Sequence, residues 1–217
     1  MKKVVISEEL IAKLPDFSVG VTSFSVTVQK SNKLDELINE LQVQIRQKYT
    51  LNDVLQIPNI KSARDGYKKL GKDPSRYRLA VESLYRRIVK NNDLYRINDV
   101  VDLGNVLSLM TMRSVAVLDE NKICGDVLIR IGKDEPYEGI GRGEINIENI
   151  PVYTDEIGPF GSPTSDTLRT AITEDTKQVL LFIISFDGKE VLKDDLQLCQ
   201  ELYEKYTDAN DFRFVII

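Results

Sequence analysis

Two stretches near the middle of the chain, SRYRLAVESLYRR (75–87) and INDVVDLGNVLSL (97–109), decide the fold. In the first, apolar side chains return every three or four residues, which predicts an amphipathic helix over 79–89. In the second, Asn98 is suited to cap a helix over 99–110, because its side chain can accept a hydrogen bond from an amide of the first turn. Each helix has one apolar face, so both are expected to pack on a core.

The first stretch lies in the most basic region of the chain. Residues 61–96 contain eleven Lys or Arg and four Asp or Glu, a net charge of +7, whereas the whole chain carries −5. All other residues therefore carry −12 together. Such a run is either an ordinary solvated face or a localised surface suited to phosphates, and the count leaves both open.

Helical patterns surround these two stretches in the first half of the chain, and short strands fill the second. A strand over 19–28, an amphipathic helix from Ser31 and a helix over 61–70 are expected in the first half. The second half predicts short strands over 115–118, 126–131, 144–147 and 151–153, a strong strand over 178–185, a helix over 191–206 and a last strand over 212–217. This order predicts an α+β fold with helices on one side of layered sheets. We expect one domain over 1–217, with a helix-rich half (1–112) and a strand-rich half (113–217).

Two segments of the second half are expected to be loops. The glycine-rich segment 132–143 matches no phosphate-binding pattern and is interpreted as a hairpin or pocket loop. The segment 154–170 is expected to be long and irregular, and loops of that length inside a compact domain tend to be functional.

Composition excludes several classes of site. The chain has no histidine, so a Ser-His-Asp or Cys-His nucleophile and histidine-ligated metals are excluded. Cys124 and Cys199 lie far apart and form no metal spacing, so both are expected to be buried free thiols. No dinucleotide loop or metal-ligand cluster is seen, so no cofactor is expected. No apolar run is long enough to span a membrane, and a cytosolic protein is expected.

Four segments, taken together, resemble the B3/B4 domain family, which carries the editing site in the beta subunit of phenylalanyl-tRNA synthetases. They are the two stretches 75–87 and 97–109, the pair Gly125-Asp126 at the start of a strand, and DTLRTAITEDT (166–176). The resemblance covers nearly the whole chain. It implies a three-layer sandwich of two sheets and a helical layer. It also implies a pocket between the two halves that, in the synthetase, hydrolyses a wrong amino acid from the 3′ end of a transfer RNA.

On this resemblance, the pocket candidates are polar residues of the matching segments: Asn98, Asp102, Asn105, Ser108, Gly125, Asp126 and Asp166. Four arginines would bind phosphates or carboxylates: Arg76, Arg78, Arg86 and Arg87. Structural roles compete with these assignments. Asn98 could serve only as a helix cap, Asp102 and Asp126 could be buried partners of Arg76 or Arg78, and Ser108 could satisfy local backbone groups. Tyr77 and Tyr85 are expected in the core.

The leading hypothesis is a free-standing domain that deacylates mischarged transfer RNA. An aminoacyl ester is activated, so a positioned water, backbone donors and the ribose hydroxyl could suffice without histidine. The expected partner is the aminoacylated 3′ end of transfer RNA, with no membrane or DNA partner. One alternative is a non-catalytic module that binds an amino acid or a transfer RNA end. Another is a structural protein that keeps the fold with an inactive pocket.

Overall fold

The computed structural model describes residues 1–217 and contains seven α-helices. The helices are α1 (Glu8–Lys13), α2 (Asp35–Lys48), α3 (Leu51–Val54), α4 (Pro58–Lys69), α5 (Ala80–Val89), α6 (Asp99–Thr111) and α7 (Leu192–Tyr206). The strands are β1 (Val4–Ile6), β2 (Ser18–Ser25), β3 (Ser114–Asp119), β4 (Val127–Ile131), β5 (Glu138–Gly139), β6 (Gly143–Glu144), β7 (Pro151–Thr154), β8 (Pro159–Gly161), β9 (Gln178–Ser185) and β10 (Asn210–Ile216). Two short 3₁₀ turns complete the chain, η1 (Glu120–Lys122) and η2 (Leu168–Thr170).

The strands form two four-stranded sheets and one small hairpin. The outer sheet has the order β1-β4-β7-β8, with β1 parallel to β4 and the other pairs antiparallel. The central sheet has the order β10-β2-β9-β3 and is antiparallel throughout. Because β2 lies between β10 and β9, strands from both halves of the sequence build the same sheet. The hairpin β5–β6 stands apart from both sheets.

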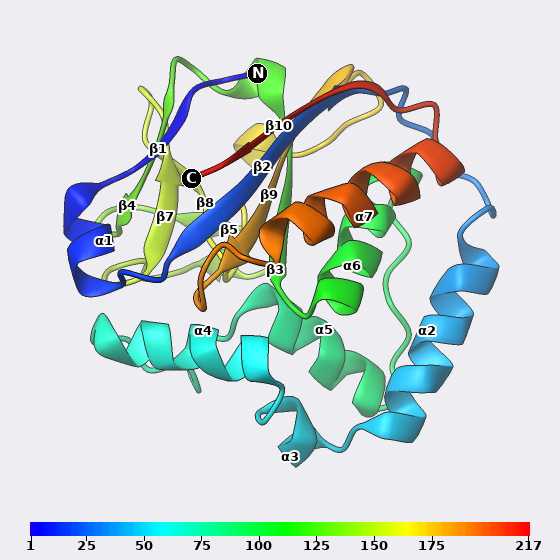
Figure 1. The fold of residues 1–217 in the computed structure, drawn as a ribbon, viewed down its shortest axis with the longest axis horizontal. Coiled ribbons are helices and arrows are strands. Elements are labelled where there is room, and N and C mark those ends of the chain that lie inside the picture. Colours follow the sequence, from blue (N-terminus) through cyan, green and yellow to red (C-terminus); the bar gives the residue numbers. More distant parts are fainter.

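The two sheets and the helices form three layers (Figure 1). Alternate residues of the central sheet point to opposite faces. On one face, Val21 and Phe182 pack against Ile129 and Phe160 of the outer sheet. On the other face, Leu181 and its neighbours pack in a larger core with the helices. The predicted α+β three-layer sandwich is confirmed.

The predicted cap at Asn98 is confirmed, and capping groups also fix the ends of two other helices. Asn98 accepts a hydrogen bond from the Val101 amide at 2.9 Å, so α6 begins at the expected residue. Thr50 and Asp53 form a capping box at α3. Gly71 has φ +92 after the end of α4, a left-handed conformation that costs glycine little. Strand β9 spans the predicted 178–185.

Several local expectations were wrong. The segment 154–170 was expected to be irregular but contains β8 and η2, because a three-residue strand is too short to show an alternating pattern. The strand expected over 144–147 is only the end of the β5–β6 hairpin. Cys124 is exposed, since it precedes the Gly125 turn, while Cys199 is buried on α7 as expected. No helix of the structure has the length and apolar character needed to cross a membrane.

Candidate functional site

The site is built on the loop that follows β8, and one buried ion pair anchors that loop. Arg169 donates two hydrogen bonds to the carboxylate of Asp155, at 2.8 and 2.9 Å. The Asp155 side chain is fully buried and also accepts amide hydrogen bonds from Cys124, Ile157 and Gly158. These bonds hold the pKa of Asp155 below its usual value although burial opposes them. The far end of the loop is therefore fixed to the turn between β7 and β8.

The middle of this loop joins the strand-rich half to the helices. The carbonyl of Pro163 accepts hydrogen bonds from the Ala80 amide at 2.8 Å and from the Ser114 hydroxyl at 3.0 Å. The Thr164 hydroxyl lies 2.9 Å from the hydroxyl of Tyr67 on α4. The loop thus lies at the seam between the two halves of the sequence, where a pocket was expected.

Asp166 lies two residues after Thr164 in the same loop and faces a group of buried tyrosines. A Cβ placed on Gly161 would lie 2.5 Å from the ring of Tyr153 and 2.7 Å from Oδ1 of Asp166, so both groups meet over this glycine. Oδ1 of Asp166 and the hydroxyl of Tyr153 are buried and have no hydrogen-bond partner within the protein. Tyr67 and Tyr137 contact the same loop, at Thr164 and Ser165. We call Asp166 and the three tyrosines, Tyr67, Tyr137 and Tyr153, the Asp166 cluster.

Burial dominates the electrostatics of the Asp166 cluster. It raises the pKa of Asp166 to about 7, although the backbone of Ser162 works against this shift. Burial also raises the pKa of Tyr153 and Tyr137, and the negative charge of Asp166 adds to both shifts. A carboxyl group with a pKa near 7 can accept or release a proton at neutral pH, which is a property of catalytic acids and bases.

Positive charge gathers beside the Asp166 cluster. Arg142, on the turn of the β5–β6 hairpin, donates to the Ser83 hydroxyl of α5 at 3.1 Å. Its pKa is lowered first by burial and also by the nearby charge of Arg78, while Tyr67 opposes the shift. Arg76 and Arg78 are exposed and make no ion pair in the structure. These three arginines, which we call the arginine rim, are available to an anionic ligand.

The two other predicted arginines are engaged within the protein. Arg86 lies 3.8 Å from the carboxylate of Glu82, which Arg64 also binds at 2.7 Å. Arg87 donates to the Asp93 carbonyl and stacks over the ring of Tyr95 at 3.7 Å. The basic region is therefore partly neutralised, whereas Arg76 and Arg78 remain exposed without an ion pair.

The candidates at the start of α6 lie far from the Asp166 cluster. Asp102 is buried and accepts from Arg96 Nε at 2.7 Å and from the Ile97 amide at 3.0 Å. The expectation that Arg76 or Arg78 would pair with Asp102 was therefore wrong. Helix α6 has thirteen residues, so Asn98 lies about 20 Å from the end of α6 that leads to Ser114.

The remaining candidates divide between α6 and β4. Ser108 is buried and donates to the carbonyl of Arg113 at 2.6 Å, whereas Asn105 is half-buried one turn earlier. Gly125 and Asp126 lie beside a shallow hollow that Asp155 and Glu156 also line. Asp126 is exposed there and is not a buried partner of an arginine. Of the predicted pocket residues, Asp166 alone lies in the cluster at the seam.

Tyr85 lies in the core, as expected, and its hydroxyl donates to the Leu109 carbonyl at 2.8 Å. The same expectation for Tyr77 was wrong: it is only half-buried, on the segment between α4 and α5, and the ammonium of Lys72 lies over its ring at 3.9 Å. Sequence reasoning missed Tyr137, Tyr153 and Arg142 as site residues. The glycines around Arg142 were the available signal, since they marked a hairpin or pocket loop.

Comparisons with known proteins define the class. The B3/4 domain family matches residues 62–215, which is more than half of the chain. The phenylalanine–tRNA ligase beta subunit of Mycoplasmoides gallisepticum (strain R(low / passage 15 / clone 2)) is 28% identical over 114 residues, 49% of this chain and 14% of that subunit. An N-terminal fragment of the phenylalanyl-tRNA synthetase beta subunit from Pyrococcus horikoshii has the same fold, with a TM-score of 0.51 and 13% identity. That match covers 97% of this chain and 50% of the fragment.

The fold and the matched residues make this chain a domain of the kind found in phenylalanyl-tRNA synthetase beta subunits. It belongs to the B3/4 domain family. The chain spans only a small part of the curated relative and half of the structural relative.

Proposed function

We propose that this domain hydrolyses the ester of mischarged transfer RNA, with Asp166 at the reacting centre. The observation that carries the proposal is that Oδ1 of Asp166 and the hydroxyl of Tyr153 are both buried without a hydrogen-bond partner, while the Tyr153 ring and Asp166 Oδ1 meet over Gly161. Buried polar groups are nearly always hydrogen-bonded, so two unpartnered groups within one cluster favour a site that receives a polar ligand. Both relatives are, by name, beta subunits of an enzyme that acts with tRNA.

In the proposed reaction, Asp166 acts as a general base. Its carboxylate takes a proton from a water molecule, whose oxygen attacks the carbonyl carbon of the aminoacyl ester. The bond between that carbon and the ribose oxygen breaks, and the ribose oxygen takes up a proton. A pKa of about 7 suits this role, because general bases work best near the operating pH. The chain has no histidine that could act as the general base in place of Asp166.

The arginine rim supports a nucleic-acid substrate. Arg76 and Arg78 are exposed without ion pairs, and Arg142 lies at the Asp166 cluster. Phosphates are bound by such cations through charge-assisted hydrogen bonds. We propose that these arginines bind phosphates near the 3′ end of a transfer RNA and so bring the ester to Asp166.

A panel of mischarged transfer RNAs tests the proposal. The full chain is incubated with each pair of amino acid and transfer RNA, and both ester hydrolysis and binding are followed. Hydrolysis of at least one pair above the spontaneous rate is expected. Binding without hydrolysis of any pair would instead support the non-catalytic binding module. That alternative draws support from Asp102 and Ser108, whose side chains serve internal hydrogen bonds.

A further inference from the structure

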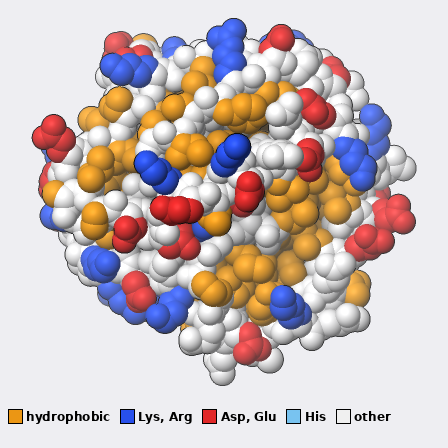
Figure 2. Space-filling view, viewed as in Figure 1, with side chains coloured by type: hydrophobic (Ala, Val, Ile, Leu, Met, Phe, Trp, Pro, Cys, Tyr) orange, Lys and Arg blue, Asp and Glu red, His pale blue; other side chains and the backbone are white.

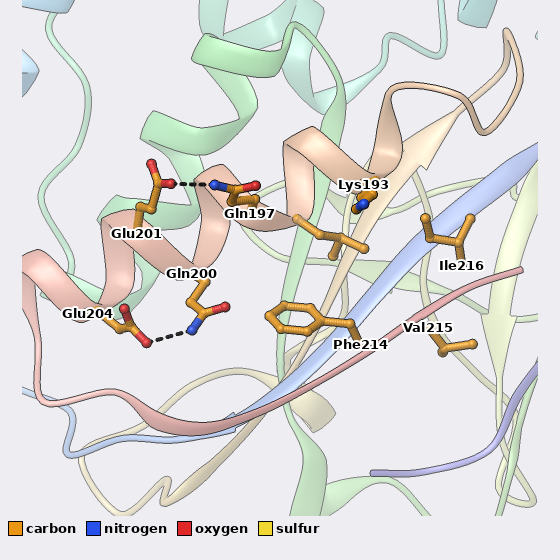
Figure 3. Close-up of a pocket in the computed structure, with 9 residues that line it drawn as sticks. Lys193, Gln197, Gln200, Glu201, Glu204, Phe214, Val215 and Ile216 are labelled. Carbon is orange, nitrogen blue, oxygen red and sulfur yellow. Dashed lines mark hydrogen bonds between the residues drawn. The ribbon is translucent and has the colours of Figure 1, made fainter.

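A hollow on the surface lies away from the Asp166 cluster, between helix α7 and strand β10 (Figure 3). Its volume is about 680 Å³. The floor is apolar, with Phe214 and Ile216 from β10 and Leu196 from α7, whereas Lys193, Gln197, Gln200, Glu201 and Glu204 form its helical wall. We call this the α7–β10 groove. The proposed deacylase makes no use of it.

The backbone beside this groove is open for pairing. Strand β10 is the edge of the central sheet and pairs only with β2. Val19 and Ile217 exchange both amide hydrogen bonds, at 2.9 and 3.1 Å. Hydrogen-bonded residues alternate along an antiparallel pair, so the amides and carbonyls of Phe214 and Ile216 point away from β2. An unpaired edge of this kind is a template for another strand.

The side chains on this edge are apolar on the α7 face. Phe212 and Phe214 stack with ring centroids 6.0 Å apart, and Phe214 remains 42% exposed. The space-filling view shows hydrophobic side chains in the region of β10 and α7 (Figure 2). The opposite face of the strand carries Arg213 and Val215, because successive residues alternate.

We propose that a second copy of this chain occupies the groove, with the two β10 strands paired antiparallel about Phe214. In this register Phe214 lies opposite Phe214 of the second copy, and Phe212 lies opposite Ile216. Arg213 lies opposite Val215, so no like charges face each other directly across the strands. Cross-strand apolar and aromatic pairs stabilise an antiparallel pair. The two central sheets join into one sheet of eight strands.

The charges on α7 are self-complementary in this arrangement, which is why a second copy is favoured over another partner. Lys193 lies at the end of the groove near Ile216, and Glu204 lies at the other end (Figure 3). The two-fold axis between the strands places both α7 helices on the same face and antiparallel. Lys193 then faces Glu204 of the second copy, and the same pair repeats across the axis, as an isologous interface requires.

Sedimentation equilibrium of the full chain tests the dimer. A concentration-dependent dimer is expected, and Phe214→Lys should weaken it by about 100-fold, since two ammonium groups replace two buried rings at the axis. Val43→Lys is the matched control, because Val43 is an exposed apolar residue on α2, outside the α7–β10 groove, and should leave the dimer unchanged. A wild-type chain that stays monomeric up to about 100 µM, a concentration well above typical dimer affinities, would overturn the proposal.

A charge exchange on α7 tests the orientation. Lys193→Glu and Glu204→Lys should each weaken the dimer by about fivefold, because each places like charges across the axis. The double variant restores the opposite pairs and should recover most of the affinity. Failure of the double variant to recover affinity, with its fold intact by circular dichroism, would contradict the two-fold arrangement. Hydrolysis of mischarged transfer RNA should be unchanged in all these variants, so the dimer and the deacylase can fail independently.

Discussion

Arg96 and Asp102 form a buried ion pair that ties the start of helix α6 to the segment before it. Arg96 Nε donates to Asp102 Oδ2 at 2.7 Å, and the Asp102 side chain is 1% exposed. Arg96 also binds Asp35 and donates to the Ser31 carbonyl, so the pair links α6 to α2. A carboxylate that the sequence offered as a pocket candidate therefore holds helices together.

Asp102→Ala should lower the free energy of unfolding by about 1–3 kcal/mol, because the change leaves the Ile97 amide without its acceptor and takes from Arg96 one of its two carboxylates. Urea denaturation measures the difference. Asp126→Ala is the control, since Asp126 is exposed and should change stability by less than about 0.5 kcal/mol. Equal effects of the two substitutions would contradict a structural role for Asp102.

Arg169→Ala should destabilise the domain by about 3–5 kcal/mol, because it leaves the fully buried carboxylate of Asp155 without its guanidinium. It should also slow hydrolysis, since the loop that carries Asp166 loses its anchor. Arg46→Ala removes an ion pair with the exposed Asp93 and should cost less than about 1 kcal/mol. Thermal unfolding of the two variants measures the difference. A loss of stability in Arg169→Ala no larger than that in Arg46→Ala would contradict the anchoring role of Arg169.

Stability should depend on pH through Asp166. Its folded pKa of about 7 lies above the ordinary value of 3.8, so the folded state binds more protons between these two values. The free energy of unfolding should therefore fall as pH rises from about 4 to 7, and the penalty should be complete above that range.

Asp166→Asn removes this charge, so it should stabilise the protein by about 2–4 kcal/mol at pH 8 relative to its effect at pH 4. Urea denaturation at the two pH values provides the measurement. Asp126→Asn should show no such difference. A pH-independent effect of Asp166→Asn would mean that the carboxyl group is not buried as described.

Binding of transfer RNA should depend on salt through Arg76 and Arg78. Each phosphate contact contributes roughly 0.7–0.9 to the slope of log affinity against log salt concentration. The double substitution by Ala should reduce that slope by about 1–2 and weaken binding. The double substitution of Arg46 and Lys205 by Ala is the matched control, because these two residues lie on α2 and α7, outside the arginine rim. An unchanged slope would exclude the two arginines as phosphate contacts.

The local structure of the chain could be predicted because its signals are short-range. The Asn98 cap and the strand over 178–185 each depend on neighbouring residues alone. The partner of Asp102 could not be predicted, since several arginines of the basic region offered the same charge and only the tertiary fold selects Arg96. Tyr67, Tyr137 and Tyr153 could not be recognised as site residues, because burial in a core and a site role call for the same aromatic side chain.

The most direct test of the proposed function is the rate of single-turnover hydrolysis of a mischarged transfer RNA, measured against pH for the wild type and for Asp166→Asn. If Asp166 is the general base, the wild-type rate rises with pH and levels off above about pH 7. The Asn variant should then be about 10²–10⁴-fold slower while it still binds the transfer RNA. Hydrolysis by the Asn variant at the wild-type rate, with the same pH profile, would contradict the assignment.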